Sequence, residues 1–152
     1  MAEEKKTAAV ADTKADAFKA YLKEAGITGF YVREFDNPVH TRRFDSHLTV
    51  QGKSLPFMIL LDDSVYTIIQ VLVAEKAVTP EREKDDCLYL NKLNDQYRML
   101  KYSADHEGNV LLTCTVPAGA AHFEPMLVLA LAGQMETHLD DVYPGLMKAL
   151  GK

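Results

Sequence analysis

One short segment of this chain carries residue types that could bind a metal ion. His138 stands shortly before Asp140 and Asp141, and imidazole and carboxylate groups are common ligands of divalent metals. The other histidines are far apart in the sequence. The same three residues also suit a solvated, acidic end of a helix, and we favour this interpretation. We therefore expect no metal site.

Two pairs of carboxylates have the spacing that acid–base catalysis can use. Asp62 and Asp63 are adjacent, and Asp105 is followed by Glu107. Each pair lies in a predicted hairpin turn, where aspartate is favoured because its side chain accepts hydrogen bonds from the turn backbone. Nothing apolar nearby is predicted to raise the pKa of these carboxyl groups. We expect them to shape turns.

Sequence motifs of enzymes are missing. The chain has no GxSxG nucleophile motif, no GxGxxG dinucleotide motif and no GxxxxGK[ST] phosphate loop. Arg42 and Arg43 form an adjacent pair that could bind an anion, but Glu34, Asp36 and Asp45 are placed to balance them. We predict that the protein is not an enzyme, has no catalytic residue and binds no cofactor.

Composition narrows the range of partners. The 152 residues carry a formal net charge of −5, whereas nucleic-acid binders usually present a basic face, so no nucleic acid is expected. The longest apolar run, Met126–Gly133, is far shorter than the roughly 20 residues that cross a bilayer, so no membrane span is expected. Cys87 and Cys114 lie in apolar patterns, which favours buried, reduced thiols and a cytoplasmic location.

Periodicity predicts a single α+β domain. Residues 1–12 are expected to form a disordered tail, and residues 13–152 one domain with a mostly antiparallel sheet of about five strands in αβββαββα order, a further strand before the middle helix being left open. Pro144 is expected to kink or break the last helix near Val142. The predicted helices cover 13–25, 80–96 and 126–138, and the predicted strands cover 29–35, 41–50, 55–61, 65–73, 99–104 and 110–116.

Two of the predicted strands are apolar on both faces. In residues 55–61, Phe57 and Ile59 alternate with Met58 and Leu60, and residues 65–73 are similarly apolar. An antiparallel sheet with one solvated face would instead alternate between apolar and polar residues. Either the helices cover both faces of the sheet, or they lie on one face and a partner covers the other. The all-round apolar run Met126–Ala132 also predicts a buried helix.

The segment Leu90-Asn91-Lys92-Leu93-Asn94, followed by Tyr97 and a hairpin, resembles the signature stretch of YbjN-like proteins. That resemblance implies a fold similar to class I type III secretion chaperones such as those that bind Tir, which are small acidic proteins that dimerise and hold a client in an extended form. YbjN-like proteins are also described as sensory-transduction regulators. Asn91 and Asn94 could bond the adjoining strand, cap the helix or remain solvated.

These observations lead to a prediction of function and to one alternative. We predict a non-enzymatic protein-binding module, a homodimer that also binds a client or regulatory protein. Its contact residues are expected to be Met58, Leu60, Ile69, Val71, Met126 and Leu129. The alternative is a small-ligand sensor with a pocket between sheet and helices, lined by Phe30, Tyr31, Phe44 and Tyr66, in which Arg42 or Arg43 meets an anion.

Overall fold

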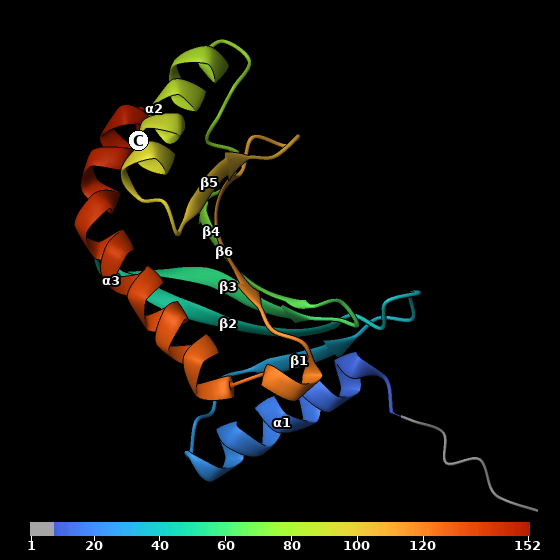
Figure 1. Cartoon of the computed structure of the whole chain (residues 1–152). Coiled ribbons are helices and arrows are strands. Elements are labelled where there is room, and N and C mark those ends of the chain that lie inside the picture. Colours follow the sequence, from blue (N-terminus) through green and yellow to red (C-terminus); the bar gives the residue numbers. More distant parts are fainter. Residues whose placement is uncertain (1–7) are drawn as a thin grey trace, which may run out of the picture.

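The computed structural model describes residues 8–152, which form three α-helices, one short 3-10 helix and six strands (Figure 1). In chain order these are α1 (Val10–Glu24), β1 (Tyr31–Glu34), β2 (Arg42–Val50), β3 (Lys53–Leu61), β4 (Tyr66–Ala74), α2 (Glu83–Gln96), β5 (Lys101–Ala104), β6 (Val110–Pro117), η1 (Ala120–His122) and α3 (Pro125–Ala149). Among these described residues, no helix has the length and apolarity needed to span a membrane.

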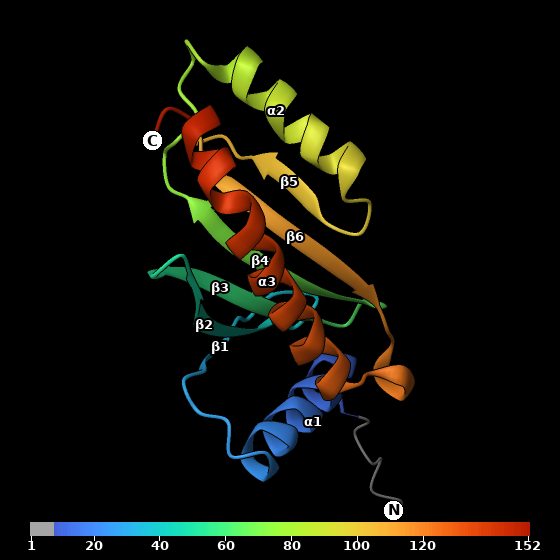
Figure 2. The same cartoon turned by 90° about the vertical axis from the view of Figure 1, so that its left-hand side faces the viewer.

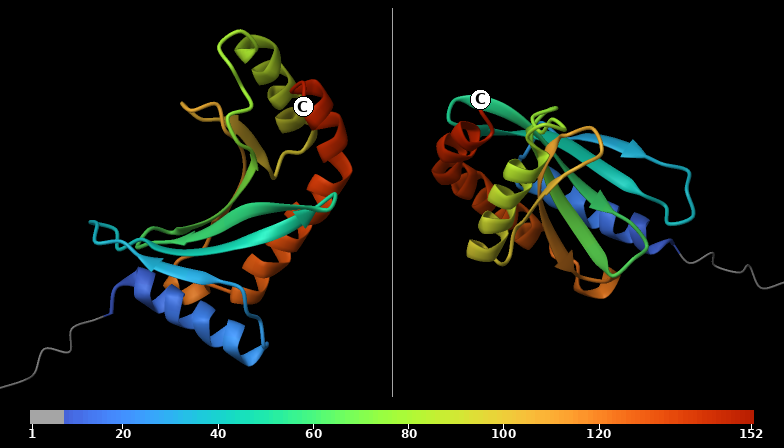
Figure 3. Two further views of the ribbon diagram at one scale, coloured as in Figure 1. Left: turned by 180° about the vertical axis from the view of Figure 1, so that it is seen from behind. Right: turned by 90° about the horizontal axis from the view of Figure 1, so that it is seen from above.

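The strands form one antiparallel sheet in the order β1-β2-β3-β4-β6-β5. The predicted α+β class with an antiparallel sheet is therefore confirmed. The sheet has six strands rather than about five, because the short strand β1 does pair with β2, from Tyr31 opposite Asp45 to Glu34 opposite Arg42. The sheet bends strongly, so that it has a convex and a concave face (Figures 1 and 3).

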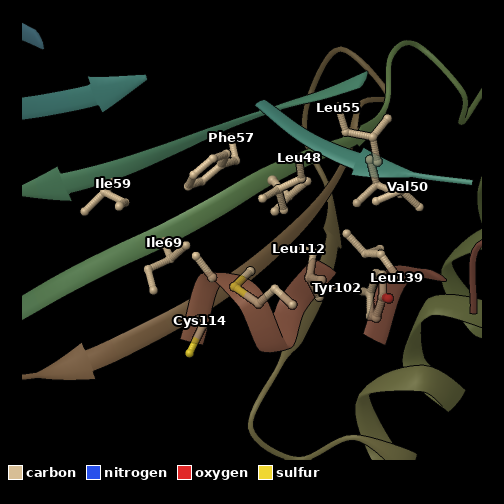
Figure 4. Close-up of a cluster of buried hydrophobic side chains, with 14 of the residues drawn as sticks. Leu48, Val50, Leu55, Phe57, Ile59, Ile69, Tyr102, Leu112, Cys114 and Leu139 are labelled. Carbon is tan, nitrogen blue, oxygen red and sulfur yellow. The ribbon is translucent and has the colours of Figure 1, made fainter. Parts of the chain in front are cut away.

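The helices occupy one side of this bent sheet. Helices α1 and α3 lie against the convex face, and α2 flanks β5 beside the C-terminal end of α3 (Figures 1 and 2). Strand side chains on the convex face form a single buried core with these helices, as Figure 4 shows around Phe57, Ile69 and Leu139. No helix within residues 8–152 covers the concave face. Of the two arrangements left open by the sequence, the structure therefore has the helices on one face.

Helix α1 begins earlier than predicted and is anchored at its first turn. Residues 10–12, assigned to the tail, are helical, and the rest of that predicted tail up to residue 7 lies outside the described residues. Asp63 Oδ1 accepts a bond of 2.9 Å from the Ala11 amide. The fully buried Lys14 donates to the carbonyls of Ser64 and Tyr66 at 2.7 and 3.1 Å, and its burial lowers the pKa of this amine.

Helix α3 runs without a break through Pro144, which excludes the break that was one of the two expectations near Val142. A proline lacks the amide that would bond the carbonyl four residues earlier, which is that of Asp140. The structure supplies a replacement donor, since Gln51 Nε2 donates to the Asp140 carbonyl at 2.8 Å and the Gln51 amide donates to Asp140 Oδ1 at 3.0 Å. Gln51 belongs to the β2–β3 turn, so this turn provides the Asp140 carbonyl with the hydrogen-bond donor that Pro144 lacks.

Replacing Gln51 with alanine should therefore lower the free energy of unfolding by about 1 kcal/mol, because the Asp140 carbonyl loses its substitute donor. In a Pro144→Ala background the cost should shrink, since the restored amide at position 144 can bond the same carbonyl. Urea unfolding of the two single variants and the double variant measures this coupling. Equal costs of Gln51→Ala in both backgrounds would show that the two sites are independent.

Candidate functional site

The concave face of the sheet has an apolar centre between polar margins. Cross-strand pairing places Asp45, Met58, Gln70 and Thr113 in one row across the sheet, and Arg43, Leu60, Ile68 and Thr115 in the next. The apolar members of these rows are partly buried rather than covered. Strands β3, β4 and β6 therefore present aliphatic side chains to the open side of the molecule, while β1, β2 and β5 present mostly polar ones.

This face is hollowed into a groove of about 480 Å³. The groove lies between β2 on one side and the β5–β6 turn on the other. Its apolar lining includes Met58, Leu72 and Leu111, and its polar lining includes Arg43 and Gln70. A concave surface that combines apolar side chains with a few polar groups is typical of a binding site.

Charged groups on the β2 side of the groove are linked to one another. Arg43 contacts Asp45 through Nε at 2.9 Å and Nη2 at 3.0 Å, and Arg33 Nε lies 3.4 Å from the same carboxylate. The Arg43 guanidinium also lies over the Phe35 ring at 5.4 Å. The side chains of Arg43 and Asp45 are thus oriented by their partners, and this margin carries an excess of one positive charge. A rigid, positive margin beside an apolar floor favours partners that are both apolar and acidic.

Four of the six predicted contact residues lie on β3 and β4, and the structure separates them into two pairs. Met58 and Leu60 lie on the concave face and are partly exposed. Ile69 and Val71 are fully buried in the core, so the prediction that they are accessible to a partner is wrong. The pairing of Ile59 with Ile69 and of Phe57 with Val71 puts both on the convex face. On β4, Ile68 and Leu72 hold the concave positions instead.

The other two predicted contact residues lie on α3, away from the concave face. Met126 is 63% exposed in the first turn of that helix, whereas Leu129 is half-buried against the core. The neighbouring Leu127 is also exposed, although it was not singled out from the sequence. The six residues therefore do not form one surface.

The pocket predicted for a small ligand is not assembled. Phe30 and Phe44 contact Phe18 in the core beneath α1, with ring centroids 5.7 and 4.8 Å away. Tyr31 and Tyr66 are 65% and 50% exposed at different strands. Of the two candidate arginines, Arg42 bonds Asp12 at 2.9 Å on the helix side, and Arg43 lines the groove of the opposite face.

The first aspartate of each carboxylate pair performs the turn role that the sequence predicted, whereas Asp63 bonds the Ala11 amide of α1. Asp62 Oδ1 accepts the Ser64 amide, and Asp105 Oδ1 accepts the amides of Glu107 and Asn109. Hydrogen bonds hold the pKa of Asp105 below its ordinary value, the strongest being that from the Asn109 side chain. The pKa of Asp63 is likewise lowered, chiefly by its bond from the α1 backbone and then by its bond with His40. Asp63 and Asp105 are therefore charged acceptors and not proton donors at neutral pH.

His138, the possible metal ligand for which we favoured a solvated helix end, instead points into the protein. Its Nε2 lies 2.7 Å from the Tyr102 hydroxyl, and the Tyr97 ring meets it edge-on at 4.4 Å. Burial lowers the pKa of His138 and raises that of Tyr102, so at neutral pH the tyrosine hydroxyl donates to a neutral imidazole. Among residues 8–152, no three His, Cys, Asp or Glu side chains are grouped as metal ligands would be.

Asn94, in the Leu90–Asn94 stretch of helix α2, joins this helix to strand β5. Its side chain makes two bonds with the backbone of the edge strand β5, from Nδ2 to the Tyr102 carbonyl at 3.0 Å and from the Tyr102 amide to Oδ1 at 2.6 Å. Leu90 and Leu93 of the same helix are buried in the core. Asn91 is exposed. Cys87 of the same helix is exposed as well, so the prediction of two buried thiols is wrong for this cysteine. Asn94 therefore closes part of the free edge of the sheet. Of the three roles that the sequence left open for this residue, bonding to the adjoining strand is the one that the structure shows.

Replacing Asn94 with alanine should lower the free energy of unfolding by about 2 kcal/mol, because it leaves two backbone groups of Tyr102 without partners. The matched control is Asn91→Ala, an exposed position on the same helix, which should change the stability by less than about 0.5 kcal/mol. Chemical denaturation of both variants measures the difference. Similar costs at the two positions would argue against the clamp.

Stability should fall as the pH falls below about 6.5, because the unfolded chain then protonates His138 while the folded chain, in which its pKa is lower, resists protonation. His138→Gln should flatten this part of the stability profile, and His106→Gln, at an exposed turn, should not. Thermal unfolding from pH 8 to pH 5 provides the measurement. An unchanged slope in His138→Gln would assign the pH dependence to other groups.

Comparison with known proteins gives one match. Residues 14–146 match the sequence model of the YbjN family, whose description is "Putative bacterial sensory transduction regulator". No curated protein and no solved structure matches the chain, so the resemblance to type III secretion chaperones is not supported by a structural relative. The family match includes the helix with Asn94, all six strands and most of α3. The chain therefore belongs to the YbjN family.

Proposed function

We propose that this protein is a non-enzymatic regulator that works in the cytoplasm by binding another protein on the concave face of its sheet. The observation that carries the proposal is the one-sided placement of the helices, which leaves an apolar, hollowed sheet face without cover from residues 8–152. A solvated face of an antiparallel sheet is normally polar. An uncovered aliphatic strip instead favours association.

The aliphatic side chains of this strip come from three neighbouring strands and are only partly buried. They are Met58, Leu60, Ile68, Leu72 and Leu111. Covering them would remove apolar surface from water at a gain of about 25 cal/mol for each Å². Met58 adds adaptability, since its flexible thioether can pack against differently shaped partners.

The titratable groups favour a binding role over catalysis. The aspartates of the turns are engaged by backbone amides, and His138 is engaged by Tyr102. In the groove, the Asp45 carboxylate is held by two arginines. A regulator of signal transduction, as the family description has it, needs a surface that changes the state of a partner and does not need a reaction centre.

We propose further that the protein self-associates through the first turns of α3. Met126 and Leu127 are 63% and 44% exposed there, beside the small residue Ala130, which is also exposed. A flat helix surface of this kind suits an isologous contact with a second copy. Because it lies on the helix side of the sheet, this contact would leave the concave face free for a different partner.

A small ligand in the same groove is a second candidate function. The volume of about 480 Å³ lies in the range of small-molecule sites. The site would be on the open face of the sheet, and not between the sheet and the helices. A metabolite that raises the thermal midpoint of the wild type, but not of Leu72→Glu, would favour this candidate.

A photo-crosslinking amino acid at position 72, on the concave face, should give a discrete adduct with another protein in cells of the source organism. The adduct should disappear when Met58→Glu places a charge beside the crosslinker. The same amino acid at Lys19, exposed on α1, is the control and should give no such adduct. Adducts that are equal at both positions, or absent at position 72, would contradict docking on this face.

In the same experiment, the crosslinker at position 126 should give a product of twice the mass of the chain, both in cells and with the purified protein. Self-association through α3 would be contradicted if purified protein gave only uncrosslinked chain at high concentration. This outcome would leave the concave-face partner unaffected, since the two surfaces are separate.

A further inference from the structure

The backbone of the concave face is already fully engaged in the sheet at its centre. Strands β2, β3, β4 and β6 have a neighbour on each side, and where the pairing runs, as across Met58, Gln70 and Thr113, their ladder groups bond one another. The edges lie at β1 and β5, and Asn94 occupies the Tyr102 amide and carbonyl at the second of these. A partner segment laid over the centre of this face can therefore contact side chains, but it finds no unpaired ladder groups there.

This constraint decides which conformation a bound segment can have. An extended peptide laid on the face would bury its own amides and carbonyls without partners, at a cost of about 1–3 kcal/mol for each group. An α-helix satisfies these groups internally and presents only side chains. A helix with one apolar stripe also matches an aliphatic strip that has polar margins on both sides.

The charged side chains of the concave face indicate which sign of charge a partner should carry. Charged side chains on the concave strand positions are Arg33, Arg43 and Lys101, against Asp45. Asp105 also lines the groove, but donors from Glu107 and Asn109 surround its carboxylate. Three cations therefore face two carboxylates in a chain whose formal net charge is −5. The concave face thus carries an excess of one positive charge, although the chain as a whole is acidic.

We infer that the concave face binds an amphipathic α-helix of a partner protein, with the apolar stripe of that helix on Met58, Leu72 and Leu111 and acidic residues along its flanks. The inference rests on the proposed function and specifies its partner. It differs from the extended client that the resemblance to secretion chaperones implies. The helix would lie in the groove between β2 and the β5–β6 turn.

Selection of binders from a random 20-residue peptide library, displayed on mRNA, tests this with the full chain as bait. Enriched peptides should carry apolar residues at positions i, i+3, i+4 and i+7 and a net negative charge. Synthetic copies should gain helical circular dichroism on binding. Arg33→Glu combined with Lys101→Glu should weaken their binding about tenfold, because two rim charges are reversed.

The matched control reverses two charges away from the groove, at the exposed positions Lys19 and Lys92 of the helices, and should change the affinity by less than twofold. Enrichment of extended, basic or uncharged peptides would overturn the inference, and so would the absence of any enrichment. Binding that is indifferent to Arg33→Glu/Lys101→Glu would also overturn it. Crosslinking at position 72 decides the proposed function separately, since it requires a protein partner but no helix.

Discussion

The register between β3 and β4 is the constraint on which the rest of the structure depends. Both strands are apolar on both faces, so hydrophobicity alone would allow either face of each strand to enter the core. Pairing Phe57 with Val71 and Ile59 with Ile69 commits these four residues to the helix side. The same register sends Met58 and Leu72 to the open side, and a slip of one residue would exchange the two sets.

Polar contacts then hold the helices rigidly on the convex face. Lys14 ties α1 to the β3–β4 turn, Gln51 ties the β2–β3 turn to α3, and Asn94 ties α2 to β5. In each case a side chain bonds backbone groups that would otherwise lack a partner. The contacts of Lys14 and Asn94 are partly buried, so breaking them leaves polar groups poorly satisfied. The concave face is thereby held in shape, which would reduce the entropic cost of binding the proposed partner.

Membership of the YbjN family and the proposed binding surface are connected through this scaffold. The stretch that carries the resemblance, Leu90–Asn94, lies on the helix side and at the β5 edge, and it does not line the groove. Its buried leucines and its edge-clamping asparagine stabilise the framework, whereas the groove is formed by strands that carry no recognisable motif. The family match itself covers residues 14–146, and so includes the strands of the groove as well as this stretch.

The sequence by itself determined the fold class, the positions of most helices and strands, and the turn roles of Asp62 and Asp105. These features follow from local periodicity and from turn chemistry, which act over a few residues. Membership of the family was also suggested by the short Leu90–Asn94 stretch. The run Met126–Ala132, for which the pattern predicted a buried helix, leaves Met126 and Leu127 exposed in the first turn of α3.

Only the tertiary structure decided which face of each apolar strand is buried, and it moved Ile69 and Val71 from the predicted surface to the core. It also supplied the donor from Gln51 that lets α3 continue through Pro144, and the hydroxyl of Tyr102 that turns His138 inward. These outcomes depend on partners more than 30 residues away in the chain. Local patterns carry no information about such partners, because pairing register and helix placement are settled by the packing of the whole domain.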